Sequence, residues 1–258
     1  MSSSNVRWDI RNSLGVLTFH RPEARNALTW DMYAALVEAC DAADARDDIR
    51  VLIIRGSGGS FAAGTDISQF EPFTSGADGV AYEHRLDAII SRLERVTVPT
   101  IAEVDGAAVG GGALLALACD LRVCSPRARF GVPVSRTLGN CLSMVNAVRL
   151  MHLLGEARVR DLMLTGRLMD VDEARQLGLV SREAPSSSIE EATLALGAEI
   201  GTRARSTIMA TRTLLQRLRE ARLASVRASD DVVEACYGSD DFREGVRAFL
   251  EGRPPRFS

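Results

Sequence analysis

The spacing of hydrophobic positions changes several times along the chain and predicts both strands and helices. Apolar and polar residues alternate over residues 6–19 with a break at residues 12–15, which indicates a β-hairpin. Residues 51–55 and 97–104 are short, mainly apolar runs, typical of strands buried on both faces of a parallel sheet, and residues 121–124 resemble them. Helical spacing, with Thr29 as the first cap, is expected in the following ranges: 30–45, 80–96, 112–118, 139–154, 158–165 and 171–176.

The last part of the chain is predicted to be helical. The strands end by about residue 180, residues 186–188 form a turn and a helix cap, and almost everything from there to residue 250 has helical character. Helices with apolar stripes need burial, so we expect this run to pack against a neighbour. We divide the chain into a core over residues 1–195 and a helical oligomerisation region over residues 196–258.

Composition places the chain among globular proteins and excludes some partners and chemistries. Hydrophobic residues make up 46% and charged residues 25% of the 258 positions, which is ordinary for such proteins. The net charge of -3 gives no general attraction to nucleic acid or to an acidic membrane surface. All 31 basic residues are arginine, so the chain can bind phosphate through guanidinium groups but cannot form a lysine Schiff base.

The cysteines and the apolar runs indicate a protein of a reducing cytoplasm. The 5 cysteines include no CxxC pair and there are only 3 histidines, so neither a zinc site nor a disulfide scaffold is predicted. The first residues lack the apolar run of a signal peptide, and no stretch reaches the roughly 20 apolar residues of a membrane span. We expect no metal and no membrane span.

Two stretches rich in small residues carry the candidate chemistry. SFAAGTDISQF at residues 60–70 and AAVGGGALLALACD at residues 107–120 each look like a strand that enters a turn, and the second then begins a helix. In such turns backbone N–H groups can face a ligand, and two convergent donors suit a developing oxyanion. The best candidates are the amides of Thr65 and Gly111. Thr65→Ala is expected to have a mild effect on ligand binding or turnover, because the backbone rather than the hydroxyl is predicted to act.

Five blocks of sequence, in order, resemble one family. They are RPEARNAL, FAAGTD, VDGAAVGGGALLALACDLRV, ARFGVP and the closing SDDFREGVRAFLEGRPPRF. The chain resembles the enoyl-CoA hydratase/isomerase (crotonase) superfamily over almost its whole length. The resemblance implies an α/β fold, a crotonase-like spiral of ββα units with a helical C-terminal trimerisation region. It also implies trimers, usually paired into hexamers, and an enzyme of the lyase or isomerase class.

The resemblance further implies which residues contact the substrate. The substrate is an acyl-CoA thioester, so coenzyme A is part of the substrate and no other cofactor is expected. Arg25 is expected near the CoA moiety and Arg253 near a CoA phosphate of an adjacent subunit, while Asp66 is more readily explained as a residue that holds its loop. The expected substrate-binding residues are Arg25, Ala27, Ala63, Asp66, Ile67, Gly110, Leu114, Pro133, Val134 and Arg253.

The sequence departs from the family at two positions that decide the reaction. Family hydratases carry two glutamates, and the motif places them at Leu114 and Val134 of this chain. Neither side chain can transfer a proton, and the loss of one general acid or base typically costs roughly 10²–10⁴-fold in rate. Standard hydration is therefore not expected, and the single-glutamate isomerase scheme also lacks its base.

Two interpretations remain open, an enzyme with a different acid or base and a non-catalytic acyl-CoA carrier. The polar residues near the expected acyl end favour an enzyme, because a carrier needs only hydrocarbon there. A dinucleotide-binding domain is disfavoured, since VGGGALLALACD lacks the G-x-G-x-x-G spacing. The candidate replacements for the glutamates are His84, Asp87, Glu103, Asp105, Ser135, Arg136, Thr137, Asn140, Cys141 and Ser143.

Overall fold

The computed structural model describes residues 4–224, 226 and 229–258. Its main sheet has six strands, of which the first two form the predicted antiparallel hairpin and the others run parallel. Asn12 and Ser13 turn the hairpin with positive φ. In spatial order the strands are β1 (Val6–Arg11), β2 (Leu14–Phe19), β3 (Val51–Gly56), β4 (Thr100–Val104), β6 (Leu121–Cys124) and β9 (Arg182–Glu183).

Three further strands form a second, smaller sheet. It contains β5 (Ala107–Val109), β7 (Arg129–Gly131) and β8 (Met169–Asp170), and β5 and β7 pair in parallel. Strand β4 passes into β5 through Gly106, whose φ is 76°. A Cβ at this glycine would lie 2.2 Å from the Gly59 carbonyl oxygen, so only glycine allows the chain to turn here from one sheet into the other.

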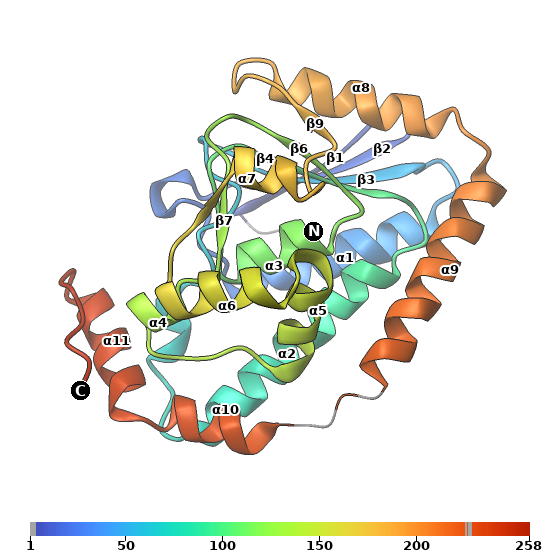
Figure 1. The fold of residues 1–258 in the computed structure, drawn as a ribbon. Helices are drawn as coiled ribbons and strands as arrows, with labels where there is room; N and C mark the ends of the chain where they lie inside the picture. The colour runs from blue at the N-terminus through green and yellow to red at the C-terminus, as the bar shows by residue number, and fades with distance from the viewer. Residues whose placement is uncertain (1–3, 225, 227–228) are drawn as a thin grey trace.

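Helices cover both faces of the main sheet (Figure 1). On one face α8 packs against Leu14, Val51 and Ile101 in a small apolar cluster. On the other face the larger core includes α1, α2 and the short apolar helix α3. The helices are η1 (Pro22–Ala24), α1 (Trp30–Ala45), η2 (Ile67–Phe70), α2 (Gly76–Arg95), α3 (Gly111–Ala118), α4 (Val134–Thr137), α5 (Met144–Leu154), α6 (Glu156–Thr165), α7 (Val171–Gln176), α8 (Ile189–Gly201), α9 (Arg205–Leu223), α10 (Asp230–Tyr237) and α11 (Asp240–Leu250).

Several element boundaries differ from the sequence-based expectation. Helix α1 begins as predicted, with Thr29 accepting from the Met32 N–H. Helix α2 begins at Gly76 and not at residue 80, because Ser75 and Asp78 form a capping box ahead of the apolar run. The predicted helix at 139–154 is wrong at its start: α5 begins at Met144.

Three short strands, β7, β8 and β9, were not predicted from periodicity. Strand β8 pairs with β7 and consists of two residues, and β9 lies beyond residue 180, where no further strand was expected. Runs of two or three residues carry too little alternation to detect. Such strands form because a neighbouring edge offers hydrogen bonds, which is a property of the folded chain.

The C-terminal helices differ in how they meet the core. Helices α10 and α11 pack on α2 and η2, and Val233, Tyr237 and Phe242 belong to the large apolar cluster. Helix α9 has no buried residue among those described and runs along one side of the molecule (Figure 1). The division between residues 195 and 196 stays a prediction, and it falls inside α8. Residues 225, 227 and 228 of the predicted helical run lie outside the described residues.

The described ranges contain neither a membrane-spanning helix nor a cluster of metal ligands. No helix there is both long enough and apolar enough to cross a bilayer. Nor do these ranges contain a group of three or more histidine, cysteine, aspartate or glutamate side chains arranged to hold a metal ion.

Candidate active site

The folded chain brings the two small-residue turns together. The Ala62 N–H donates to the Ala107 carbonyl at 3.0 Å, and the Val109 N–H donates to the Ala62 carbonyl at 2.9 Å. Gly64 and Gly110 form the bends, with φ of 106° and 54°, which side chains rarely allow. A Cβ on Gly64 would lie 3.2 Å from the Val109 carbonyl oxygen. The two bends are therefore in contact.

Two backbone N–H groups at this junction have no backbone acceptor. Within the described part of the chain, neither Thr65 nor Gly111 donates its N–H to a carbonyl. Gly111 is the first residue of α3, where N–H groups lack partners inside the helix. Leu28 holds the loop on both sides of Thr65: its N–H donates to the Gly64 carbonyl at 2.7 Å, and its carbonyl accepts from the Asp66 N–H at 2.9 Å.

The Thr65 side chain is part of a buried cluster of hydroxyl groups. Its Oγ1 lies 2.8 Å from the Tyr33 hydroxyl and 2.7 Å from the Tyr82 hydroxyl. All three residues are buried. This hydroxyl therefore has a structural role that the sequence did not indicate, because its loss leaves two buried tyrosines without their partner. The expected mild effect of Thr65→Ala on ligand binding stays a prediction. The cluster ties α1 and α2 to the loop that carries the Thr65 amide.

A cavity of about 660 Å³ is lined by both Thr65 and Gly111, a size that suits a small-molecule site. Helices α2, α3 and α4, together with the loops before η2 and α3, form its wall. The expected oxyanion-hole and substrate-binding residues, with the exception of Arg253, all line this cavity: Arg25, Ala27, Ala63, Thr65, Asp66, Ile67, Gly110, Gly111, Leu114, Pro133 and Val134.

Charged side chains lie at one part of the cavity wall. Asp66 accepts hydrogen bonds from the Ser68 N–H at 3.0 Å and from Ser68 Oγ at 2.8 Å, and its carboxylate also pairs with Arg21. The expectation that Asp66 holds its loop is thus confirmed. Arg25 and Arg136 also line the cavity and are exposed to solvent, so their guanidinium groups can meet a ligand there.

Comparison with known proteins now decides the family. A sequence profile described as enoyl-CoA hydratase/isomerase matches residues 9–258. The chain belongs to this family. The relatives extend over nearly the whole chain, and the expected α/β fold of the crotonase superfamily is confirmed by the solved structures that it matches.

Three relatives illustrate the similarity. A Thermus thermophilus protein is 35% identical over 258 residues, which are 96% of this chain and 98% of the relative. Enoyl-CoA hydratase EchA19 of Mycobacterium tuberculosis is 33% identical, over 94% of this chain and 92% of its own length. The crystal structure of methylmalonyl-CoA decarboxylase complexed with 2S-carboxypropyl CoA has a TM-score of 0.87 and 28% identity, over 100% of this chain and 99% of that one.

His84 and Asp87, the two residues of α2 that were predicted as possible replacements for the glutamates, do not line the cavity. His84 Nε2 lies 3.0 Å from Asp230 Oδ1, and both side chains are exposed. Asp87 accepts from Ser143 Oγ at 2.9 Å and from Arg149 at 3.2 Å. These contacts point both residues to a different part of the surface, between α2 and α10.

Glu103 and Asp105 are also away from the two amides. They line a separate cavity beside the β1–β2 hairpin. Glu103 lies 3.9 Å from Arg55, and Asp105 is 2.7 Å from Arg127. The position of Asp105 directly after β4 suggested proximity to the glycine turn, but the chain turns away between them at Gly106.

The polar segment after β7 is divided between the cavity and other contacts. Three of its residues line the cavity: Arg136, Thr137 and Asn140. Ser135 instead donates to the Met163 carbonyl at 2.7 Å. Asn140 donates to the Tyr237 hydroxyl at 2.9 Å, and Ser143 provides the cap of α5.

Glu83 is a buried residue of the cavity wall that was not among the candidates predicted from sequence. This residue is 1% exposed and follows Tyr82 on α2. The signal was available in the helical spacing, since Glu83 lies on the same stripe as Tyr82, Leu86, Ile90 and Leu93, all of which are buried. A carboxyl on an apolar stripe is costly to bury, and such exceptions often mark function.

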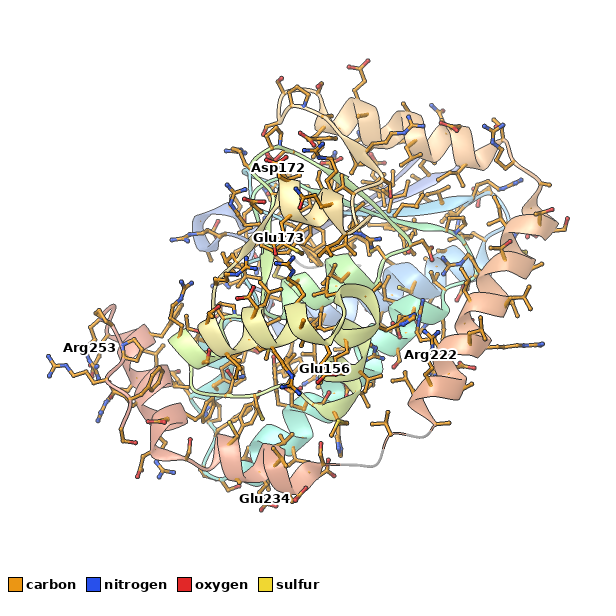
Figure 2. All side chains as sticks on the ribbon, viewed as in Figure 1. Glu156, Asp172, Glu173, Arg222, Glu234 and Arg253 are labelled. Atoms are coloured by element: carbon orange, nitrogen blue, oxygen red, sulfur yellow. The ribbon has the colours of Figure 1, made fainter. Side chains whose placement is uncertain are left out.

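Arg253 differs from the other expected substrate-binding residues because it does not line the cavity. Figure 2 shows it on the C-terminal tail at the outer edge of the molecule. Its guanidinium pairs with Glu244 at 2.6 Å and with Glu251 at 2.5 Å. Its expected contact with CoA concerns an adjacent subunit and stays a prediction.

Proposed function

We propose that the protein binds an acyl-CoA thioester in this cavity, with the thioester oxygen between the N–H groups of Thr65 and Gly111. The supporting observation is that two turns meet at one cavity, and each carries an N–H without a backbone acceptor in the described chain. Such a donor is typically worth roughly 2.7–4 kcal/mol when charge develops on the oxygen. The CoA ligand of the decarboxylase relative supports the same substrate class.

Arginine side chains are proposed to hold the CoA portion. Arg25 and Arg136 line the cavity and are exposed, and a guanidinium matches the paired oxygens of a phosphate. Arg253 is proposed to reach a CoA phosphate from an adjacent subunit. No cofactor beyond the CoA of the substrate is proposed.

The proposed chemistry is not standard hydration. Leu114 is 3% exposed and lies in the cavity wall with Val134, so hydrocarbon stands at the positions to which the family motif assigns the glutamates. Thr137 and Asn140 add polar groups to the same wall, which favours an enzyme over a carrier. We infer an enzyme of the lyase or isomerase class.

The protein is also proposed to form trimers or hexamers in a reducing cytoplasm. Support for assembly comes from α9, on which Leu214, Leu215 and Leu218 are 62%, 56% and 58% exposed. A helix with so much uncovered hydrocarbon is expected to be buried by a second copy of the chain. All five cysteines are free, which suits a reducing compartment.

The first test uses crotonyl-CoA and the unmodified protein. Titration calorimetry should detect binding, because the amides and the groove do not depend on the missing glutamates. Hydration should be slower than that of a two-glutamate relative by roughly 10²-fold or more. Hydration at a rate on the order of 10 s⁻¹, an ordinary enzyme turnover, would contradict the proposed chemistry.

A matched pair of variants tests the Gly111 amide. A Cβ at Gly111 would lie 2.3 Å from the Tyr33 hydroxyl, so both variants are made in a Tyr33→Phe background. Gly111→Pro removes the N–H, and Gly111→Ala keeps it while adding a similar Cβ. With a carbon-13 label at the thioester carbonyl of crotonyl-CoA, binding should move the signal downfield in the Ala variant and less in the Pro variant. Equal shifts would refute the assignment.

A further inference from the structure

Glu83 is one of the residues that line the same cavity as Thr65 and Gly111, and it also lines the smaller cavity between α2 and α10. Its neighbour Tyr82 contacts Thr65 Oγ1 at 2.7 Å, so the helix that carries Glu83 is tied directly to the loop of the Thr65 amide. Leu114 and Val134 form another part of the wall. This acidic residue of the cavity wall, Glu83, therefore belongs to α2, whereas the family motif places the glutamates at Leu114 of α3 and Val134 of α4.

Neutral donors hold this carboxyl. The Tyr237 hydroxyl donates to Glu83 Oε1 at 2.7 Å, and the Ser143 N–H donates to Oε2 at 2.8 Å. The guanidinium of Arg149 reaches this part of α2 but pairs with Asp87 at 3.2 Å and with Glu94 at 3.1 Å. A buried carboxyl whose donors are uncharged keeps a high proton affinity. It also has a fixed orientation.

The hydrogen bonds of the Tyr237 hydroxyl fix which group donates to Glu83. Asn140 Nδ2 donates to the Tyr237 hydroxyl at 2.9 Å, so the single hydroxyl proton is left to point at Glu83. Asn140 Oδ1 is buried and has no hydrogen-bond partner among the described residues. Because Asn140 lines the cavity too, this end of the wall carries an acceptor that the protein itself leaves unsatisfied.

We propose that Glu83 removes and returns a proton at the carbon next to the thioester carbonyl of the bound acyl-CoA. The proposal rests on the proposed function, since the thioester must lie at the two amides. The Cα–H bond breaks, its electron pair forms a double bond to the thioester carbon, and the carbonyl oxygen becomes an enolate oxygen that the amides of Thr65 and Gly111 stabilise. The proton moves to the Glu83 carboxylate.

The reverse transfer completes a balanced reaction without water or an oxidant. If the Glu83 carboxyl first exchanges its proton with solvent and then returns one to Cα, the result is exchange of the Cα hydrogen with solvent. If the acyl group has a double bond between its β and γ carbons, the proton can return to the γ carbon and the double bond moves to the α and β carbons. The substrate class is therefore a β,γ-unsaturated acyl-CoA, and a saturated acyl-CoA is a probe of the first step alone.

The proton affinity of Glu83 suits this role. Burial raises the pKa of its carboxyl to about 7, opposed in part by the bonds from Tyr237 and Ser143. A base must be deprotonated to act, so exchange should increase with pH through about 7 and level off above it. The charged and titratable groups that face Glu83 are Asp87 on α2, Tyr82 on the same helix, Tyr33 on α1, Tyr237 and Cys236 on α10, and Cys141 before α5.

The neighbouring tyrosines do not titrate in the pH range where Glu83 is expected to lose its proton, so they do not shape the pH profile of exchange. Burial raises the pKa of Tyr33, Tyr82 and Tyr237, so these phenols stay neutral. The thiol of Cys236 has its pKa lowered by a hydrogen bond with Cys141, and a thiolate there would raise the pKa of Glu83 further. The profile is therefore measured in a Cys236→Ser background as well.

The experiment measures deuterium uptake at Cα of butanoyl-CoA in heavy water by mass spectrometry. The unmodified protein should catalyse uptake, and Glu83→Gln should reduce the rate by roughly 10²–10⁴-fold while calorimetric binding of butanoyl-CoA is kept. Asp87→Asn is the matched control. It removes a carboxylate one turn further along α2 that does not line the cavity, so uptake should persist, with its pH midpoint moved down because a neighbouring negative charge is gone.

The outcomes separate this inference from the proposed function. Absence of any butanoyl-CoA binding by the unmodified protein would overturn the proposed function itself. Binding without deuterium uptake would overturn the role of Glu83 and leave an acyl-CoA carrier. Equal uptake by Glu83→Gln and the unmodified protein would also overturn it. If the Gln variant does not fold, the unmodified protein decides alone: a rate independent of pH between about 5.5 and 8.5 contradicts a Glu83 base.

Discussion

Thr65 takes part in the site with two different groups. Its backbone N–H has no backbone acceptor among the described residues, and its side-chain hydroxyl contacts Tyr33 and Tyr82 at 2.8 and 2.7 Å. The first group is predicted to act on the ligand, and the second holds the loop in place. Substitutions of the side chain therefore test position and packing and leave the amide itself present.

Thr65→Val should destabilise the fold, because it keeps the shape and removes the hydroxyl from a residue that is 8% exposed. Leaving buried tyrosine hydroxyls unpaired costs about 1–3 kcal/mol in the free energy of unfolding. Thr65→Ser keeps the hydroxyl and serves as the control, with a smaller loss. Urea unfolding followed by circular dichroism gives both values. A Val variant as stable as the Ser variant would show that the hydroxyl cluster contributes little.

Helices α2 and α10 meet through glycines of α2. A Cβ at Gly76 would lie 1.9 Å from the Glu234 carbonyl oxygen, and one at Gly79 would lie 2.1 Å from the ring of Tyr237. The absence of side chains at these positions lets α10 come close enough for the Tyr237 hydroxyl to reach Glu83. The hydrogen bond to Glu83 therefore depends on the close contact between α2 and α10.

Gly79→Ala should separate the two helices. The added methyl meets a ring that is itself 2% exposed, so backbone must move, and overpacking of this kind costs typically about 1–3 kcal/mol. Gly201→Ala at the end of α8 is the matched control, since its nearest neighbour would be 3.8 Å away. We expect lower stability and slower deuterium uptake into butanoyl-CoA for Gly79→Ala alone. Unchanged uptake would mean that the Tyr237 contact does not position Glu83.

At the scale of the whole molecule, the C-terminal helices have two different surroundings. Helices α10 and α11 complete the core next to the cavity, and Phe249 of α11 lines it. Helix α9 leaves an uncovered apolar face made by Leu214, Leu215 and Leu218. That face is the main support for assembly with further copies of the chain.

Sedimentation at micromolar concentration should show a trimer or a hexamer. Leu214→Glu combined with Leu218→Glu places two charges one turn apart on the exposed face of α9 and should shift the protein toward monomer. Thr213→Glu adds a charge to the same helix at an exposed position and should leave assembly unchanged. A monomeric unmodified protein would refute the assembly proposal.

Local features of this protein could be predicted from sequence because their causes are local. The hairpin follows from alternation around Asn12, α1 from its Thr29 cap and apolar spacing, and the two bends from glycines that tolerate positive φ. The cavity position of Leu114 and Val134 also followed from motif spacing. In each case a few neighbouring residues contain the physical reason.

Tertiary structure decided which distant side chains meet. Glu83 lines the cavity only because α2 packs its buried face against the core. Its partner Tyr237 belongs to a helix about 150 residues later in the chain. Glu103 and Asp105, close in sequence to the glycine turn, face another cavity. Spacing along the chain determines which residues share a face of a helix or strand. The packing of whole elements determines what that face contacts. Burial by this packing then raises the pKa of the Glu83 carboxyl.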